Sequence, residues 1–175
     1  MREDIKEKAK KYKILNEVAL KNEVVILGST YMFNFPFYEF MQGHITDYAV
    51  YNRSIEGIKI KEATETVEDS LKYLSPGIIL VALGDEDDET EEAIADYRVL
   101  VKKLKSLYKN SKIYIMQPYG KSKTFCAGIK SISEEYGLEY VEMSGVVGLN
   151  RVFGRLSAYF HRDGISFGDA FGRGC

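Results

Sequence analysis

Residues 78–83 read Ile-Ile-Leu-Val-Ala-Leu, an apolar run that no polar side chain interrupts. Two further segments, 24–27 and 113–116, are also built of apolar, aromatic and β-branched residues without polar alternation. A strand needs such a run only when helices cover both faces of its sheet. The sequence therefore predicts that these three segments are adjacent central strands of a parallel sheet.

The rest of the chain alternates between shorter strand patterns and helical patterns. Short apolar segments at 48–51 and 140–141 predict two outer strands, and helices are predicted at 2–21, 37–43, 61–74, 89–109, 122–137 and 151–159. Strands that alternate with helices indicate a three-layer α/β/α sandwich around a flavodoxin-like parallel sheet of five strands in the order 2-1-3-4-5. We expect one such domain over residues 1–175.

Length, charge and composition limit the classes of function. With 24 basic and 26 acidic residues among 175, the net charge of −2 gives no reason to expect nucleic acid or an anionic membrane as a partner. No apolar run approaches the roughly 20 residues that span a bilayer, and the first residues do not resemble a secretory signal. Cys126 and Cys175 lie far apart and imply no disulfide framework. We therefore expect a soluble, cytoplasmic protein.

Polar segments follow the first three predicted strands directly. They read Gly-Ser-Thr at 28–30, Asn-Arg-Ser-Ile-Glu-Gly at 52–57 and Gly-Asp-Glu-Asp at 84–87, and a fourth polar segment at 163–166 reads Asp-Gly-Ile-Ser. Ligand sites of open parallel sheets lie beyond the carboxyl ends of the strands. We therefore expect the first three segments to form one site, joined by the fourth.

These four segments together resemble the catalytic blocks of the GDSL/SGNH-type ester hydrolases, and the resemblance runs over nearly the whole chain. The first block, followed by Phe35-Pro36 and Glu39, resembles bacterial members and puts Thr30 at the nucleophile position, with Ser29 offset by one residue. The second block is the most specific match. It implies that the backbone N–H of Gly57 donates to the oxyanion that forms during acyl transfer.

The resemblance also implies which chemistry has been exchanged. Glu86 stands where the family has an asparagine that donates to the oxyanion, and Ser166 stands where it has the catalytic histidine, three residues after Asp163. Without an imidazole, no group there takes the hydroxyl proton near neutral pH. An ionised Glu86 would repel the developing oxyanion, and losing even one donor costs about 10²–10³ in rate.

Three further residues are candidates for ligand contact, namely Ser29, Asn52 and His161. His161 lies near Asp163, but its register is wrong for the base of a triad. The acidic residues at 85–89 lack the spacing of oxygen ligands, so no metal site is predicted. No dinucleotide, P-loop or zinc-protease motif occurs, and no cofactor is expected.

Two other classes of α/β protein fit less well. A flavodoxin wraps phosphate with a loop after the first strand, but residues 31–33 read Tyr-Met-Phe and provide no glycine. A response-regulator receiver needs an acidic pair at that point, which is absent, although Asp85 would suit its aspartate after the third strand.

The sequence thus favours a protein of the SGNH hydrolase type whose triad chemistry is lost. The first hypothesis is a degenerate member that binds a small polar or acylated ligand in a retained cleft. The alternative is a divergent hydrolase of short acyl or O-acetylated carbohydrate esters that uses an unusual base. In both, the partner is a small molecule or an ester substrate. Oligomeric state stays open.

Overall fold

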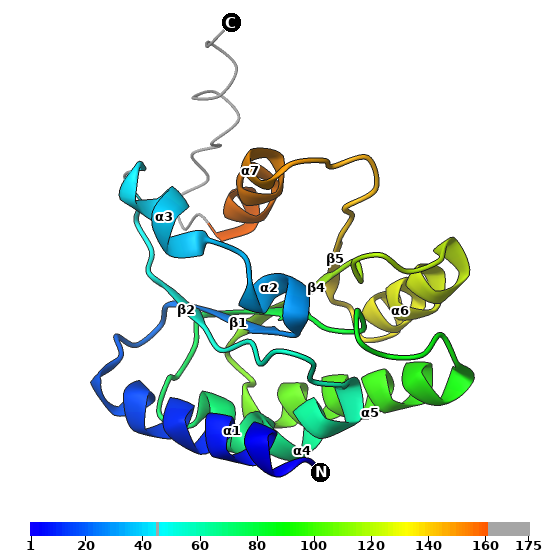
Figure 1. Ribbon diagram of the computed structural model, residues 1–175, viewed down its shortest axis with the longest axis horizontal. Coiled ribbons are helices and arrows are strands. Elements are labelled where there is room, and N and C mark those ends of the chain that lie inside the picture. Colours follow the sequence, from blue (N-terminus) through cyan, green and yellow to red (C-terminus); the bar gives the residue numbers. More distant parts are fainter. Residues whose placement is uncertain (45, 161–175) are drawn as a thin grey trace, which may run out of the picture.

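The computed structural model of this protein describes residues 1–44 and 46–160. Five parallel strands form one sheet in the order β2-β1-β3-β4-β5, with β1 (Val24–Gly28), β3 (Ile78–Ala82) and β4 (Lys112–Met116) in the centre. β2 (Val50–Asn52) and β5 (Glu139–Val141) are the short edge strands. The predicted strand order and the three-layer α/β/α arrangement are confirmed (Figure 1).

One face of the sheet carries the long helices. α1 (Glu3–Leu15), α4 (Ile60–Leu71), α5 (Glu91–Leu107) and α6 (Lys123–Glu135) bury their apolar sides against alternate strand residues such as Val25, Leu27 and Val81. α5 supplies four of the fully buried side chains there, Tyr97, Leu100, Val101 and Leu104. Their helical spacing places these side chains on the side of α5 that faces the sheet.

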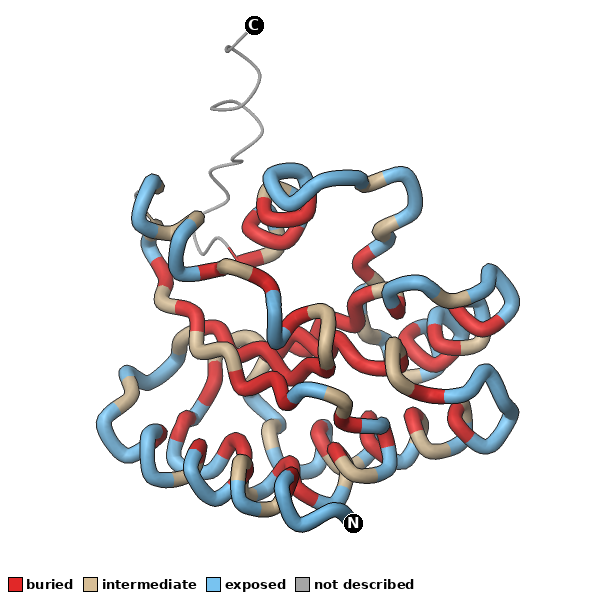
Figure 2. Tube along the Cα trace, in the orientation of Figure 1, coloured by how far each residue is buried: buried red, intermediate tan, exposed pale blue. Residues whose placement is uncertain are grey.

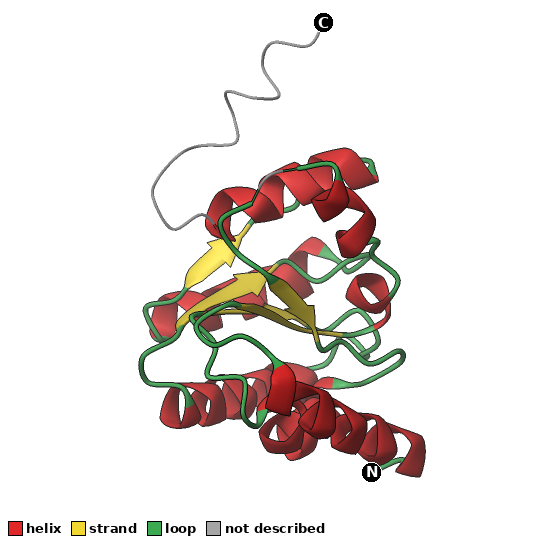
Figure 3. Ribbon diagram, turned by 90° about the vertical axis from the view of Figure 1, so that its left-hand side faces the viewer, coloured by secondary structure: helices red, strands yellow, loops and turns green. Residues whose placement is uncertain are grey.

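The opposite face is covered by more aromatic helices, two of which are short. α2 (Thr30–Phe33), α3 (Phe37–Gln42) and α7 (Leu149–Phe160) pack on the other set of strand residues, among them Ile26 and Leu80. Side chains of successive strand residues point to opposite faces, which explains why Val25 and Ile26 belong to different cores. Figure 3 shows the sheet between its two helix layers, and Figure 2 shows burial concentrated on the strands and the inward sides of the helices.

Strand register brings the polar segments together. β1 pairs with β3 from Val24 opposite Ile78 to Gly28 opposite Ala82, so the loops after both strands begin side by side. The segment after β2 continues along β1, where the N–H of Arg53 donates to the carbonyl of Ile26 at 2.8 Å and the N–H of Ile55 to that of Gly28 at 3.1 Å. Three segments distant in sequence therefore meet at the carboxyl ends of β1, β2 and β3.

Some boundaries differ from the predicted ones. The predicted helix 2–21 ends at Leu15 and continues only as a 3₁₀ turn, Asn16–Val18. The short helix α2 was not predicted, because four residues are too few to show a helical period. No helix within the described residues is long and apolar enough to cross a membrane.

Candidate active site

A pocket of about 510 Å³ opens at the carboxyl ends of β1, β3 and β4. Thr30 and Glu86, two residues singled out from the sequence, both line it. The rest of the lining consists of aromatic, acidic, amide, basic and aliphatic side chains and one glycine: Tyr31, Asn34, Phe35, Asp85, Tyr119, Gly120, Lys121 and Leu149. Its position agrees with the expected site beyond the ends of parallel strands.

Thr30 is the first residue of α2, and its hydroxyl accepts a hydrogen bond from the backbone. The backbone N–H of Gly57 donates to the Thr30 Oγ1 at 2.8 Å. Gly57 has a φ of +69°, in the left-handed region that favours glycine, and this turn aims its N–H at Thr30. The structure therefore brings Thr30 and Gly57 into direct contact across 27 residues of sequence.

Two carboxylates lie in the same pocket. The backbone N–H of Tyr31 donates to the Asp85 Oδ2 at 2.9 Å, which ties the loop after β3 to the start of α2. The other oxygen of Asp85, Oδ1, is buried and has no hydrogen-bond partner among the described residues. Burial raises the pKa of Asp85, and the neighbouring Glu86 raises it further. Asp85 and Glu86 thus add acceptors to the pocket, whereas the oxyanion of acyl transfer needs donors.

Ser29 and Asn52 hold the backbone of the site and do not line the pocket. Ser29 is fully buried, and its hydroxyl donates to the carbonyl of Ile58 at 2.8 Å. The Asn52 amide donates to the carbonyl of Met32 at 2.8 Å, and its oxygen accepts from the N–H of Ser54 at 3.1 Å. Both side chains fix the segment 52–58 against β1 and α2, where it presents Gly57 to Thr30.

A buried arginine, Arg53, holds the same segment in place. Arg53 is only 6% exposed, and its Nε donates to the Asn16 Oδ1 at 2.8 Å. Its guanidinium lies over the rings of Tyr12 and Tyr51, at 5.1 and 5.3 Å from their centroids. These hydrogen-bond and cation–π contacts stabilise a buried charge. The sequence shows Arg53 in the second block, but its partners in α1 and in the 3₁₀ turn Asn16–Val18 carry no recognisable motif.

Lys121 and Asp87 connect two loops at the rim of the pocket. The Lys121 ammonium donates to the backbone carbonyl of Asp87 at 2.6 Å. The Asp87 carboxylate accepts from the N–H of Ile60, the first residue of α4, at 3.2 Å. Burial raises the pKa of Asp87 from 3.8 to about 6, although Lys59 and Lys121 oppose the shift. Sequence reasoning missed Lys121 and Tyr119, whose signal is their position directly after the fourth strand.

The remaining predicted site residues, His161, Asp163 and Ser166, lie outside the described residues. Over the described ranges, the pocket lining contains no imidazole. His44 lies away from it, with Nδ1 2.6 Å from the carbonyl of Phe40 and its ring against Phe153. Of the predicted site residues that the structure describes, Thr30 therefore contacts Gly57 and lines the same pocket as Glu86.

Comparison with solved structures gives likenesses over most of the chain. A Streptococcus pneumonia protein, provisionally assigned as a platelet activating factor, has a TM-score of 0.67 at 16% identity, covering 85% of this chain and 79% of that one. A GDSL-like lipase from Bacteroides thetaiotaomicron has a TM-score of 0.60 at 15% identity, covering 82% of each chain. Psychrotrophic esterase EstA from Pseudoalteromonas sp. has a TM-score of 0.54 at 20% identity, covering 75% of this chain and 86% of that one.

This chain has the SGNH/GDSL hydrolase fold. No family model matches its sequence, and no curated protein matches it. At identities of 15–20% the likeness establishes the fold and leaves the chemistry to the residues of the site.

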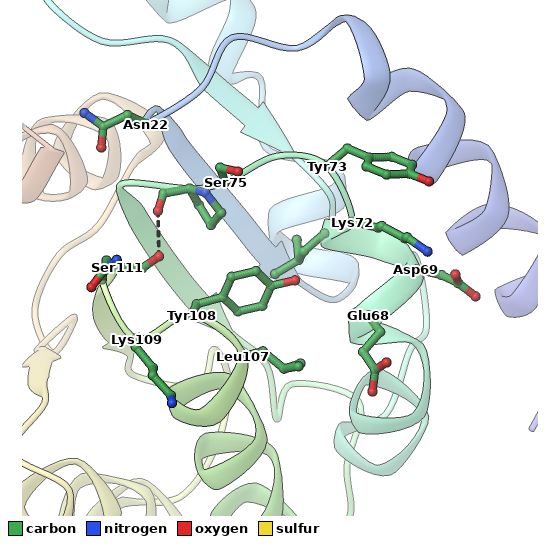
Figure 4. Close-up of a pocket in the computed structure, with 13 residues that line it drawn as sticks. Asn22, Glu68, Asp69, Lys72, Tyr73, Ser75, Leu107, Tyr108, Lys109 and Ser111 are labelled. Atoms are coloured by element: carbon green, nitrogen blue, oxygen red, sulfur yellow. Dashed lines mark hydrogen bonds between the residues drawn. The ribbon is translucent and has the colours of Figure 1, made fainter.

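A second pocket of about 590 Å³ lies at the opposite end of this SGNH-type sheet (Figure 4). Its lining includes Asn22, Pro76 and Ser111, which precede β1, β3 and β4, and the carboxyl-terminal ends of α4 and α5. The Ser111 hydroxyl donates to the carbonyl of Pro76 within it. None of the residues singled out from the sequence lines this pocket, so the Thr30 pocket remains the candidate active site.

Proposed function

We propose that the Thr30 pocket binds a small polar or acylated ligand and does not hydrolyse esters efficiently. One observation carries the proposal: the Thr30 hydroxyl accepts the Gly57 N–H, while the carboxylates of Asp85 and Glu86 line the same pocket. In an ester hydrolase this N–H would donate to the oxyanion. Here the Gly57 N–H donates instead to the hydroxyl of Thr30, at the nucleophile position. A tetrahedral intermediate formed here would meet negative charge where it needs donors.

The pocket supports the binding half of the proposal. Its volume of about 510 Å³ falls within the roughly 300–1,000 Å³ of small-molecule sites. The aromatic residues Tyr31 and Phe35 line it together with Asn34 and Lys121, so the lining combines apolar contact with a few hydrogen-bonding groups. Such a lining suits a ligand of mixed character, for which an ester or its acid is one example.

Structural neighbours with this fold include a psychrotrophic esterase and an acetyl xylan esterase. Their descriptions favour an acyl ester as the chemical type of ligand for this pocket. They do not favour turnover here, because the residues at the positions of the family's amide and imidazole are Glu86 and Ser166.

A divergent ester hydrolase is the second candidate, and Asp85 favours it. Its carboxylate is bonded to the N–H of Tyr31, the residue after Thr30, and burial raises its pKa. A carboxylate with a raised pKa is a better general base near neutral pH. On this alternative, Asp85 would take the Thr30 proton during attack on short acyl or O-acetylated carbohydrate esters.

Labelling with a fluorophosphonate, followed by intact-mass measurement, tests the proposal. We expect no adduct on Thr30 in the wild-type protein at pH 7, and the same result for Thr30→Ala. The Pseudoalteromonas esterase is a suitable positive control, since its structure is described as inhibited by monoethylphosphonate. An adduct in the wild type that Thr30→Ala abolishes, and that Asp85→Asn slows, would establish the divergent hydrolase instead.

A further inference from the structure

The charged side chains of the Thr30 pocket limit which ligands it can hold. Among the described lining residues, Asp85 and Glu86 are acidic and Lys121 is the only basic one. The Lys121 ammonium already donates to the backbone carbonyl of Asp87 at 2.6 Å. Glu86 is half-buried, and no residue that the structure describes forms a hydrogen bond or an ion pair with its side chain. The lining therefore holds a carboxylate that the protein itself does not neutralise by direct contact.

Arg2 acts on Glu86 from outside the lining without pairing with it. The Nε and Nη2 atoms of Arg2 each lie 3.1 Å from one carboxylate oxygen of Glu62. This hydrogen bonding to Glu62 is the main cause of the raised pKa of Arg2, and the charge of Glu86 adds to it. The guanidinium is thus held by Glu62, and the carboxylate of Glu86 stays available to a ligand.

The nitrogen donors of the lining serve the protein, whereas oxygen acceptors are left over. The Asn34 Nδ2 donates to the carbonyl of Thr30 at 3.0 Å, and the N–H of Tyr31 donates to Asp85 at 2.9 Å. The Asn34 Oδ1, like the Glu86 carboxylate, accepts no hydrogen bond from the described residues. A polar ligand group that binds beside these oxygens must therefore bring its own N–H or O–H donors.

The remaining lining favours an organic cation over a metal ion. Tyr31, Phe35 and Tyr119 contribute aromatic rings, and the face of such a ring attracts a cation. Within the described part of the chain, no group of three or more His, Cys, Asp or Glu side chains could hold a metal ion. A positive charge carried on the carbon skeleton of a small molecule fits both observations.

We infer that the ligand of the Thr30 pocket carries a primary ammonium group that donates to the Glu86 carboxylate. Such a group combines a positive charge with three N–H donors and so matches the free acceptors of the lining. Asp85 places a second negative charge in the same loop, and its buried Oδ1 has no hydrogen-bond partner among the described residues. This inference rests on the proposed function and adds the substrate class, an acyl compound with an amino group. The carboxylate that opposes an oxyanion thereby acquires a role in binding.

Four amides of one skeleton test the inference at pH 7. β-Alanine N-methylamide ends in an ammonium group, N-methylbutanamide replaces this group with a methyl group, and N-methylsuccinamate replaces it with a carboxylate. Because a hydrogen bond to a charged group is the strong kind, the ammonium compound should bind on the order of tenfold or more tighter than the methyl compound. The carboxylate compound should bind most weakly of the three. The trimethylated β-alanine amide keeps the charge without N–H donors, and it should bind more weakly than the primary amine.

A matched pair of variants shows whether Glu86 is the group that recognises the ammonium. Glu86→Gln keeps the size of the side chain and removes its charge, so the ammonium and methyl compounds should bind this variant with similar affinity. Asp88→Asn removes the same charge two residues later, from a side chain that is 87% exposed and lies outside the lining. It should therefore keep the wild-type preference for the ammonium compound.

Calorimetric titration gives the affinities, and the backbone amide signals of Thr30, Gly57 and Glu86 locate the site. Equal wild-type affinity for the ammonium, methyl and carboxylate compounds, with Thr30 and Gly57 still perturbed, would overturn the ammonium site and leave the proposed function standing. The same holds for a trimethylated compound that binds as tightly as the primary amine, or for a preference that survives Glu86→Gln. No perturbation of Thr30 or Gly57 by any of the four amides would refute the proposed function as well.

Discussion

Under the proposed function Glu86 opposes ester hydrolysis most directly, because it lines the Thr30 pocket with a carboxylate where the resemblance to SGNH hydrolases implies a donor. If only the chemistry was lost, Glu86→Asn together with Ser166→His should restore measurable hydrolysis of p-nitrophenyl acetate. Ser166→His alone should restore less, since a base generates an alkoxide but Glu86 still opposes the oxyanion. Thr30→Ser should add a further gain by removing a methyl group that crowds attack.

Residues that act as a unit do not contribute additively, so the order of these rates carries the information. The controls are circular dichroism spectra of each variant and Thr30→Ala in the double-variant background. A folded triple variant without activity on any short ester would mean that the cleft itself has been remodelled beyond its catalytic residues.

The Asp87 carboxyl should make the free energy of unfolding fall as the pH rises from 4 to 7. Its carboxyl is 7% exposed, and burial raises its pKa from 3.8 to about 6. The folded state therefore favours the protonated form, whose stabilising contribution is complete below about pH 4 and is lost as the pH rises through about 6. Between pH 4 and pH 7 the wild type should lose roughly 1–3 kcal/mol of unfolding free energy relative to Asp87→Asn.

Urea unfolding of both proteins across that pH range measures the difference. Asparagine keeps an oxygen that accepts from the N–H of Ile60, so the variant isolates the titration from the hydrogen bond. Stability profiles that run parallel from pH 4 to pH 7 would contradict the assignment of a raised pKa to Asp87.

Gly28 shows how tightly the start of the site is packed. A Cβ atom at this position would lie 2.7 Å from the Met32 Cβ and 2.7 Å from the Ser54 Oγ. Gly28→Ala should therefore cost about 1–3 kcal/mol through overpacking. Gly154 in α7 has nothing within 4 Å of its Cβ direction, so Gly154→Ala should stabilise the helix by about 0.5–1 kcal/mol. Thermal unfolding of the two variants should give shifts of opposite sign, and equal shifts would contradict the packing at Gly28.

Strands and helices could be predicted from the sequence wherever an apolar pattern continued over enough residues. The runs at 24–27, 78–83 and 113–116 predicted the three central strands, because only doubly covered strands need continuous apolar sequence. The edge strand expected at 48–51 begins later, at Val50, since pairing with β1 decides where an edge strand starts. Helix α2 depends on the loop geometry around Thr30 and has no pattern of its own.

Helix caps give a prediction at this scale. Thr90 accepts from the N–H of Ala93 at the start of α5, and Ser122 accepts from that of Phe125 at the start of α6, both at 3.2 Å. Thr90→Ala and Ser122→Ala should each lower the unfolding free energy by about 1 kcal/mol, whereas Thr90→Ser should lower it much less. Chemical denaturation measures these values, and an alanine variant as stable as its serine counterpart would contradict the capping role.

At the scale of the whole molecule, topology made part of the site predictable. Because parallel strands all end on the same side of a sheet, Thr30, Gly57 and Glu86 were expected to lie together. Thr30 and Gly57 are in contact. Ser29 and Asn52 were predicted as candidates for ligand contact, because in a sequence a hydroxyl or an amide looks the same whether it faces a ligand or a buried carbonyl. Their hydrogen bonds to Ile58 and Met32 emerge only when the chain folds.

The proposed function requires an intact cleft that does not catalyse efficient acyl transfer. The most direct measurement is the initial rate of p-nitrophenyl acetate hydrolysis at pH 7 by the wild type and by Thr30→Ala, at matched concentration and with folding verified for both. We predict that the two rates are equal within error and stay within a few-fold of the buffer rate, since the described pocket lining contains no imidazole base and includes Asp85 and Glu86 as well as Thr30. A wild-type rate at least a hundredfold above buffer that Thr30→Ala abolishes would contradict the account.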